Sequence, residues 1–203
     1  MKKLIFILFT LLLTTALHAQ HHHGNGDELG ATEINAEHSV YHLEAEWTDH
    51  RGDTYSLRDF SGKPVIVVMF YGNCAQVCPV LIEDARRLYS AVDRTKQDSV
   101  RVLAITFDVE NDTPEVLRAY AEKEQLNIPG WHFMRSEAAS VRTLATMLGV
   151  QYAEKSDGHF AHSNLLTVLD KKGRIARRVE GLFQPVDEAA SEINAIIQEG
   201  KSQ

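Results

Sequence analysis

Two long apolar runs, each followed by a segment of helical spacing, dominate the hydrophobic pattern of the chain. The run over residues 64–71 is unbroken and rich in branched side chains, and the run over 100–107 is mostly apolar, which predicts two strands buried in a sheet. After each run, over 79–92 and 112–124, apolar residues recur every three or four positions, which predicts helices packed on that sheet. The remaining predicted elements are a short strand over 131–134, a helix over 137–148 ended by Gly149, a hairpin of strands 165–169 and 174–179, and a closing helix over 186–198.

A further hairpin is expected near the start of this pattern. Polar and apolar residues alternate over 40–57, with a turn at Gly52. With this extension, the order of elements is that of a thioredoxin-like α/β sandwich, in which helices flank a central mixed sheet. Functional sites of such open sheets lie beyond the carboxyl ends of the central strands. The chemistry is therefore expected just after the run over 64–71.

The first residues of the chain have the pattern of an export signal. Lys2 and Lys3 precede an apolar stretch over 4–17, and the small Ala19 follows it. We expect a signal peptide over 1–19, cleaved after Ala19 or else retained as an anchor in the inner membrane, and a periplasmic location. Residues 20–38 lack an apolar period and are expected to form a flexible, histidine-containing leader, followed by a single domain over 39–203.

Composition and charge narrow the function classes. The chain is 44% hydrophobic and 24% charged, which is typical of a globular domain. Its formal net charge is −7, and removal of residues 1–19 deletes two lysines and no acids, which lowers it to −9. An acidic chain of this kind is not expected to bind nucleic acid, or anionic lipid through a basic patch. Contact with a membrane is expected only through an uncleaved N-terminus.

Cys74 and Cys78 are the only cysteines, and they follow the first buried run. The pair can close a disulfide or offer two thiolates to a soft metal ion. A disulfide across so short a loop would constrain the unfolded chain little, so a redox or metal role is favoured over a structural one. In a thioredoxin-like topology, His162 enters from the loop opposite the cysteines. Two thiolates and an imidazole suit Cu(I) in three-coordination, whereas Zn(II) requires a fourth ligand.

Three segments together resemble the Sco (SenC, PrrC) family of copper chaperones for cytochrome oxidase assembly. They are residues 74–79, 107–115 and 161–163, and the resemblance extends over roughly 41–197. It implies a bound copper ion, Cu(I) or Cu(II), and a partner that is cytochrome c oxidase subunit II or another copper protein, with a periplasmic thiol reductant. The residues to which it assigns roles are Cys74, Cys78 and His162 as copper ligands and Asp108 as a supporting residue; a turn or capping role is the alternative for Asp108.

A second hypothesis gives the cysteines a catalytic role. In a thiol-disulfide oxidoreductase, Cys74 or Cys78 attacks a disulfide of the partner's copper site, and the other cysteine resolves the mixed disulfide. The family usually carries proline and aspartate between its cysteines, whereas this chain has Ala75 and Gln76. Both differences can change copper affinity and reduction potential. A copper or redox sensor is a further hypothesis that the sequence does not separate from the chaperone.

The leader offers a second candidate copper site. Cleavage after Ala19 would make Gln20 the first residue, followed by His21 and His22. A free amine, two backbone nitrogens and the imidazole of a histidine in third position can enclose Cu(II) in a square plane. The hypothesis is a weak copper-capturing arm, and the alternative is a solvated histidine-rich tail.

Overall fold

The computed structural model describes residues 29–32, 35, 37–74 and 77–199. The expected signal peptide and the second copper site at His21 and His22 lie outside the described residues. None of the helices in the described ranges is long and apolar enough to cross a membrane.

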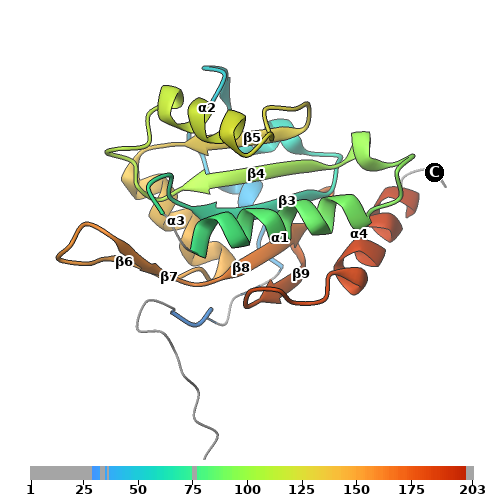
Figure 1. Cartoon of the computed structure of the whole chain (residues 1–203). Helices are drawn as coiled ribbons and strands as arrows, with labels where there is room; N and C mark the ends of the chain where they lie inside the picture. Colours follow the sequence, from blue (N-terminus) through green and yellow to red (C-terminus); the bar gives the residue numbers. More distant parts are fainter. Residues whose placement is uncertain (1–28, 33–34, 36, 75–76, 200–203) are drawn as a thin grey trace, which may run out of the picture.

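A mixed sheet forms the centre of the described domain (Figure 1). Its strands are β1 (Trp47–Asp49), β2 (Thr54–Tyr55), β3 (Val65–Phe70), β4 (Arg101–Thr106), β5 (Trp131–Arg135), β8 (Leu165–Leu169) and β9 (Ile175–Glu180). Their order across the sheet is β2-β1-β5-β4-β3-β8-β9. The three central strands β3, β4 and β5 are parallel, and β8 runs antiparallel to β3.

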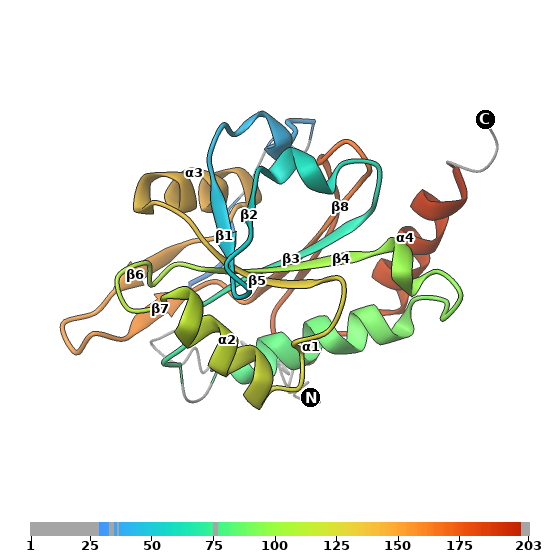
Figure 2. The same ribbon diagram turned by 90° about the horizontal axis from the view of Figure 1, so that it is seen from above.

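Helices cover both faces of this sheet. They are α1 (Val77–Ala91), α2 (Pro114–Lys123), α3 (Ala138–Leu148) and α4 (Asp187–Glu199). Figure 2 shows α1 and α2 on one face and α3 on the other, and α4 packs beside α1. The predicted architecture, a mixed sheet flanked by helices with an N-terminal hairpin, is confirmed.

The helices form where their apolar spacing and capping residues predict them. In α1 the buried positions Leu81, Ile82, Ala85 and Leu88 form one stripe facing the sheet. The Thr113 side chain caps α2 by accepting a hydrogen bond from the backbone N–H of Val116. Gly149 ends α3 in the left-handed conformation, with φ of 76°, as expected of a C-terminal glycine.

The register of the two central strands decides where the site lies. All six residues of β3 are buried, and Phe70 at its end pairs with Thr106 at the end of β4. The carboxyl ends of these parallel strands are therefore level. The segments that leave them, which begin at Tyr71 and Phe107, start side by side at one edge of the sheet.

The N-terminal hairpin is shorter than the alternation predicts. Within the predicted range 40–57, the hairpin consists of β1 and β2 alone, with Trp47 opposite Tyr55. Residues 40–42 form a 3-10 helix instead of extending the strand. The Ser39 side chain caps this turn by accepting from the N–H of Tyr41. Local capping by a hydroxyl thus replaces strand pairing at the beginning of the expected hairpin.

A second, two-stranded sheet was not predicted. It consists of β6 (Tyr152–Glu154) and β7 (Phe160–His162), paired antiparallel so that Tyr152 lies opposite His162. The expectation of a plain loop before β8 is therefore wrong, because His162 is the last residue of a strand. Most of the hairpin is solvent-exposed, so it lacks the alternation by which strands are recognised.

Residues 29–32, within the expected leader, are hydrogen-bonded to the domain. The N–H of Leu29 donates to the carbonyl of His162 at 3.2 Å, and the N–H of Thr32 donates to the carbonyl of Gly149 at 2.9 Å. The Ser163 hydroxyl donates to the carbonyl of Gly30 at 3.0 Å. This part of the segment is therefore attached to the end of α3 and to the end of β7, where His162 lies.

Candidate metal centre

The two cysteines lie in the connection between β3 and α1. Cys74 is in the turn, and Cys78 lies in the first turn of the helix, where its backbone N–H donates to the Cys74 sulfur at 3.2 Å. The exposed fraction is 9% for Cys74 and 0% for Cys78, and no disulfide joins the two. The positive end of the α1 dipole favours negative charge on sulfur at this position.

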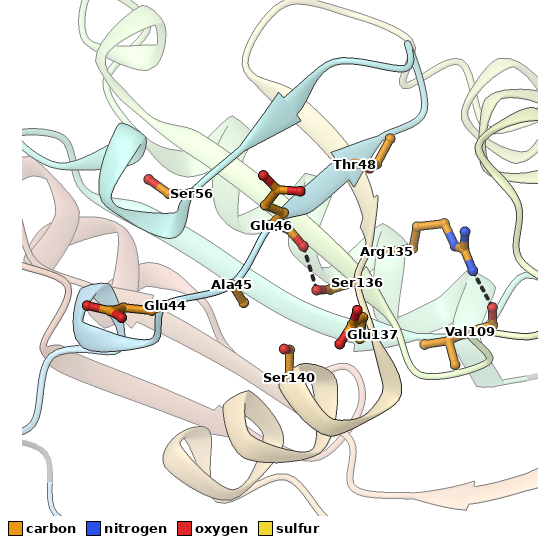
Figure 3. Close-up of a pocket in the computed structure, with 10 residues that line it drawn as sticks. All are labelled: Glu44, Ala45, Glu46, Thr48, Ser56, Val109, Arg135, Ser136, Glu137 and Ser140. Carbon is orange, nitrogen blue, oxygen red and sulfur yellow. Dashed lines mark hydrogen bonds between the residues drawn. The ribbon is translucent and has the colours of Figure 1, made fainter.

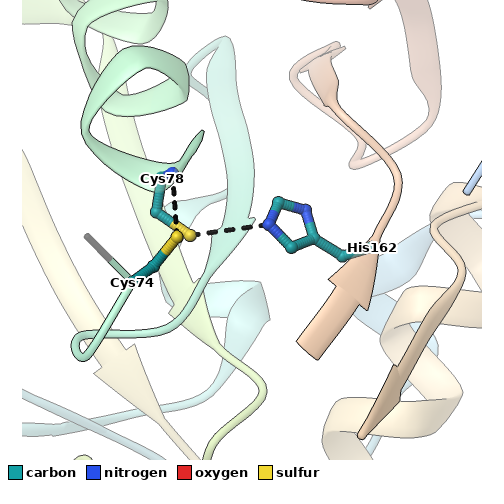
Figure 4. Close-up of side chains that lie close together, drawn as sticks. All are labelled: Cys74, Cys78 and His162. Carbon is teal, nitrogen blue, oxygen red and sulfur yellow. Dashed lines mark hydrogen bonds between the residues drawn. The ribbon is translucent and has the colours of Figure 1, made fainter. Parts of the chain in front are cut away.

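His162 reaches the cysteines from β7 (Figure 4). Its Nε2 lies 3.5 Å from the Sγ of Cys78. Its Nδ1 lies 3.1 Å from the carbonyl oxygen of Ser163, which can only accept, so Nδ1 carries the proton in this contact. The lone pair of Nε2 therefore faces the sulfur, which is the orientation that a metal ligand needs.

Together these side chains form a compact donor set. The ligand atoms of Cys74, Cys78 and His162 all lie within 4.8 Å of one another. Among the described residues, no other group of three or more cysteine, histidine or acidic side chains is arranged in this way. Two sulfurs and one imidazole nitrogen are soft or borderline donors, so the chemistry of the set fits Cu(I) better than a hard cation. The structure thus brings together the three ligands that the sequence predicts.

Burial sets the protonation of the site in the absence of metal. It raises the pKa of the Cys78 thiol far above its usual value, and the neighbouring Cys74 raises it further. Burial also raises the pKa of Tyr71 to about 12, again with a contribution from Cys74. Cys78 is therefore a neutral thiol at ordinary pH, and a metal ion must displace its proton to bind.

Aromatic side chains surround the imidazole, and the sequence reasoning did not identify them. The ring centroids of Phe107 and Tyr71 lie 5.2 Å and 6.2 Å from that of His162, and Phe160 packs against both aromatic rings. These rings limit the access of water and restrict rotation of the ligand. Tyr71 and Phe107 directly follow the two central strands, which is the one sequence signal that could have indicated their place.

His159 lies at the rim of this aromatic group and outside the donor set. It is exposed, and its Nδ1 is 3.4 Å from the hydroxyl of Tyr71. This placement makes it a useful comparison for His162, since both histidines belong to the same hairpin.

Asp108, the expected supporting residue, binds its own turn. Its carboxylate accepts from the backbone and side-chain nitrogens of Asn111, at 3.3 Å and 2.9 Å from Oδ1. The residue that contacts the cysteine turn is Asp112, whose Oδ2 accepts from the N–H of Gly72 at 2.8 Å. Nothing in the sequence distinguishes this role from that of an ordinary residue at a helix start.

A polar cleft lies at the carboxyl end of β5, separate from the donor set (Figure 3). It has a volume of about 760 Å³ and shares no lining residue with the cysteines or His162. Arg135 bridges its edge by donating to the carbonyl of Val109 at 2.5 Å. The lining residues are Glu44, Ala45, Glu46, Thr48, Ser56, Val109, Arg135, Ser136, Glu137 and Ser140.

Comparisons by sequence and by structure relate this chain to one family of proteins. Residues 35–198 match the family described as SCO1/SenC. The SCO1 protein homolog of Bacillus subtilis is 22% identical over 148 residues, which cover 71% of this chain and 76% of that protein. The SCO2-like protein RP587 of Rickettsia prowazekii is 23% identical over 135 residues, and the match spans 64% of each protein's length. The copper-bound structure of Bradyrhizobium japonicum ScoI superposes with a TM-score of 0.62 at 23% identity and covers 75% of this chain and 96% of that one.

Proposed function

Because the chain belongs to the SCO1/SenC family, we propose that it is a metallochaperone that carries one copper ion between Cys74, Cys78 and His162. The observation that supports this most directly is the convergence of the three ligand atoms within 4.8 Å. The copper-bound relative from B. japonicum supports the choice of metal. Copper is the cargo of the protein, and no bond of a substrate is made or broken.

The residues of the site have separable tasks in loading. The two thiols bind as thiolates, so Cys78 gives up its proton when copper enters. His162 offers Nε2 because Ser163 holds its other nitrogen. The buried surroundings then keep water and oxidants away from the sulfur atoms, which favours the reduced ion.

Release begins most readily at the more exposed ligand. Cys74 is 9% exposed, whereas Cys78 is fully buried and His162 is 3% exposed. A ligand of an acceptor protein can therefore replace Cys74 first. The ion is then shared between the two proteins until Cys78 and His162 dissociate from it. Copper keeps its oxidation state throughout this exchange.

We place this activity in the periplasm, after export through residues 1–19. The proposed acceptor is cytochrome c oxidase subunit II or another copper protein, and a thiol reductant keeps the cysteine pair reduced. The two cysteines are the only ones in the chain, so in an oxidising compartment the pair would otherwise form a disulfide that cannot hold copper.

A thiol-disulfide oxidoreductase is the second candidate, favoured by the contact between the cysteines. The N–H of Cys78 donates to the Cys74 sulfur, which stabilises a thiolate on the more exposed residue. In this reaction Cys74 attacks a partner disulfide and Cys78 resolves the mixed disulfide. The pair loses two electrons and two protons and becomes a disulfide, and the partner's two cysteines are reduced to thiols.

Anaerobic titration of the reduced protein with Cu(I) separates the two candidates. We expect one copper per domain, and we expect His162→Ala to lose more affinity than the roughly 10- to 100-fold cost of disturbing the surroundings of a metal site. The matched control is His159→Ala, which removes a histidine of the same hairpin outside the donor set. Full affinity in the His162→Ala protein, together with retained reduction of a disulfide substrate, would support the oxidoreductase instead.

A further inference from the structure

Asp112 is a buried carboxylate that neither the metal site nor the helix cap uses. It is 1% exposed and lies two residues before α2. The sequence places it at the opening of that helix, but the cap is Thr113, whose side chain accepts from the N–H of Val116. A buried carboxylate needs compensating hydrogen bonds, and the identity of its partners indicates its task.

Both partners of Asp112 lie at the carboxyl ends of the central strands. Its Oδ2 accepts from the backbone N–H of Gly72 at 2.8 Å and from the hydroxyl of Thr106, which is fully buried at the end of β4. The Thr106 oxygen in turn accepts from the N–H of Asp108 at 3.0 Å. One carboxylate oxygen thus joins the turn after β3 to the turn after β4.

The turn held in this way is the one that carries Cys74. Gly72 precedes that cysteine by two residues, and its backbone lies against the carboxylate. A methyl group at position 72 would stand 2.6 Å from Oδ1 of Asp112 and 3.3 Å from its Cγ. The backbone at Gly72 is not in the left-handed region, so this contact with Asp112 explains why the position lacks a side chain.

We infer that Asp112 is a positioning residue of the metal centre, which fixes the turn at Gly72 so that the Cys74 sulfur stays within reach of the ligand atoms of Cys78 and His162. The inference rests on the proposed copper site. Cys78 is held by α1 and His162 by the β6–β7 hairpin, whereas Cys74 lies in a turn without regular structure. The N–H of Cys74 donates to the carbonyl of Tyr71 within the turn, and the hydrogen bond from Gly72 to Asp112 ties this turn to the segment after β4.

The test compares Cu(I) affinity in Asp112→Ala and Asp112→Asn with that of the wild type. We expect Asp112→Ala to bind copper about 10- to 100-fold more weakly, as for other residues that orient a metal ligand. Asp112→Asn keeps an oxygen that can accept from Gly72 and Thr106, so we expect it to restore most of that loss. The comparison of the two variants separates the hydrogen bonds of the carboxylate from its charge.

Asp84→Ala is the matched control. Asp84 is 3% exposed and lies on α1, and its Oδ2 accepts a backbone N–H, that of Phe183, at 2.8 Å. It therefore resembles Asp112 in burial and in accepting a backbone N–H, but it also pairs with Arg87 and anchors a different loop. We expect Asp84→Ala to lower the free energy of unfolding and to leave Cu(I) affinity unchanged. An equal loss of affinity in both alanine variants would overturn the inference.

Gly72→Ala disturbs the same contact by changing the other residue. Its methyl group would displace the carboxylate, so we expect this variant also to bind copper more weakly. In the Gly72→Ala, Asp112→Ala double variant, we expect no further loss beyond Asp112→Ala alone, because the residues act through one contact. Fully additive losses would contradict the inference. If Asp112→Ala does not fold, the Gly72→Ala variant decides alone. A Cu(I) affinity equal to that of the wild type would then overturn the inference.

The outcomes also separate this inference from the proposed function. Failure of the wild-type protein to bind copper through the cysteines and His162 would remove the proposed function. Wild-type binding with undiminished affinity in the Asp112 variants would remove only the positioning role.

Discussion

The protonation of Cys78 makes copper binding depend on pH in a defined direction. Burial raises the pKa of this thiol, with a further contribution from Cys74, so the thiol is neutral in the metal-free protein across the neutral range. In the proposed site copper binds the thiolate of Cys78, so loading must release the proton of this thiol. The apparent affinity then increases with pH, by about 10-fold or about 1.4 kcal/mol per pH unit for each proton released.

The expected magnitude follows from that count. Between about pH 7 and about pH 9, the proton of Cys78 alone gives an increase of about 100-fold, or about 2.7 kcal/mol. Competition with a Cu(I) chelator of known pH dependence measures this slope under anaerobic conditions. Calorimetric titration in two buffers with different ionisation enthalpies counts the released protons independently, and we expect at least one per copper ion.

A flat profile would refute this reasoning. If the affinity, corrected for the chelator, did not change over this range, Cys78 would already be a thiolate in the metal-free protein. The burial argument would then be wrong, and stabilisation by the α1 dipole would outweigh it. Cys78→Ser provides the control, because the number of protons released per copper ion should fall by one when this thiol is absent.

Two further predictions concern the same edge of the sheet. Phe183 is 72% exposed and has a φ of 58°, a left-handed conformation that is unfavourable for any residue with a side chain. Phe183→Gly should therefore raise the free energy of unfolding, measured in urea, by about 0.5–1 kcal/mol. A decrease would show that this loop is not strained. Limited alkylation should modify Cys74, which is 9% exposed, before the fully buried Cys78, as measured by peptide mass mapping, and equal modification of both would show that the turn opens in solution.

The central sheet could be predicted because its strands have an unambiguous pattern. Residues 65–70 and 101–106 lie inside apolar runs, and the helices that follow have regular spacing. The β6–β7 hairpin could not be found in this way, since each of its strands has only three residues and neither shows an alternating pattern. Its Tyr152 packs on Phe107, with ring centroids 4.9 Å apart, and such a contact between distant residues leaves no local pattern.

The candidate site also combines residues that a local pattern indicates with residues that only the fold brings together. Cys74 and Cys78 are predicted from their position after a buried strand and His162 from the fold, and the structure brings the three side chains together. Asp112 was missed because its partners are a backbone N–H and the Thr106 hydroxyl from neighbouring strand ends, which only the register of β3 and β4 brings together. A role that consists of holding another segment's backbone has no signature in the residue's own neighbourhood.

The division of the ligands between two sheets has a mechanical consequence. The cysteines follow a strand of the main sheet, and His162 ends a strand of the separate hairpin. In the proposed copper site, an ion between Cys78 and His162 would cross-link a chain segment of 84 residues, and a permanent bridge of that span would constrain the unfolded chain by about 4–5 kcal/mol. The bound ion would then also act as a removable cross-link between the main sheet and the β6–β7 hairpin. An acceptor that takes the ion would release this cross-link in the same event, so delivery of copper and relaxation of the hairpin would be coupled.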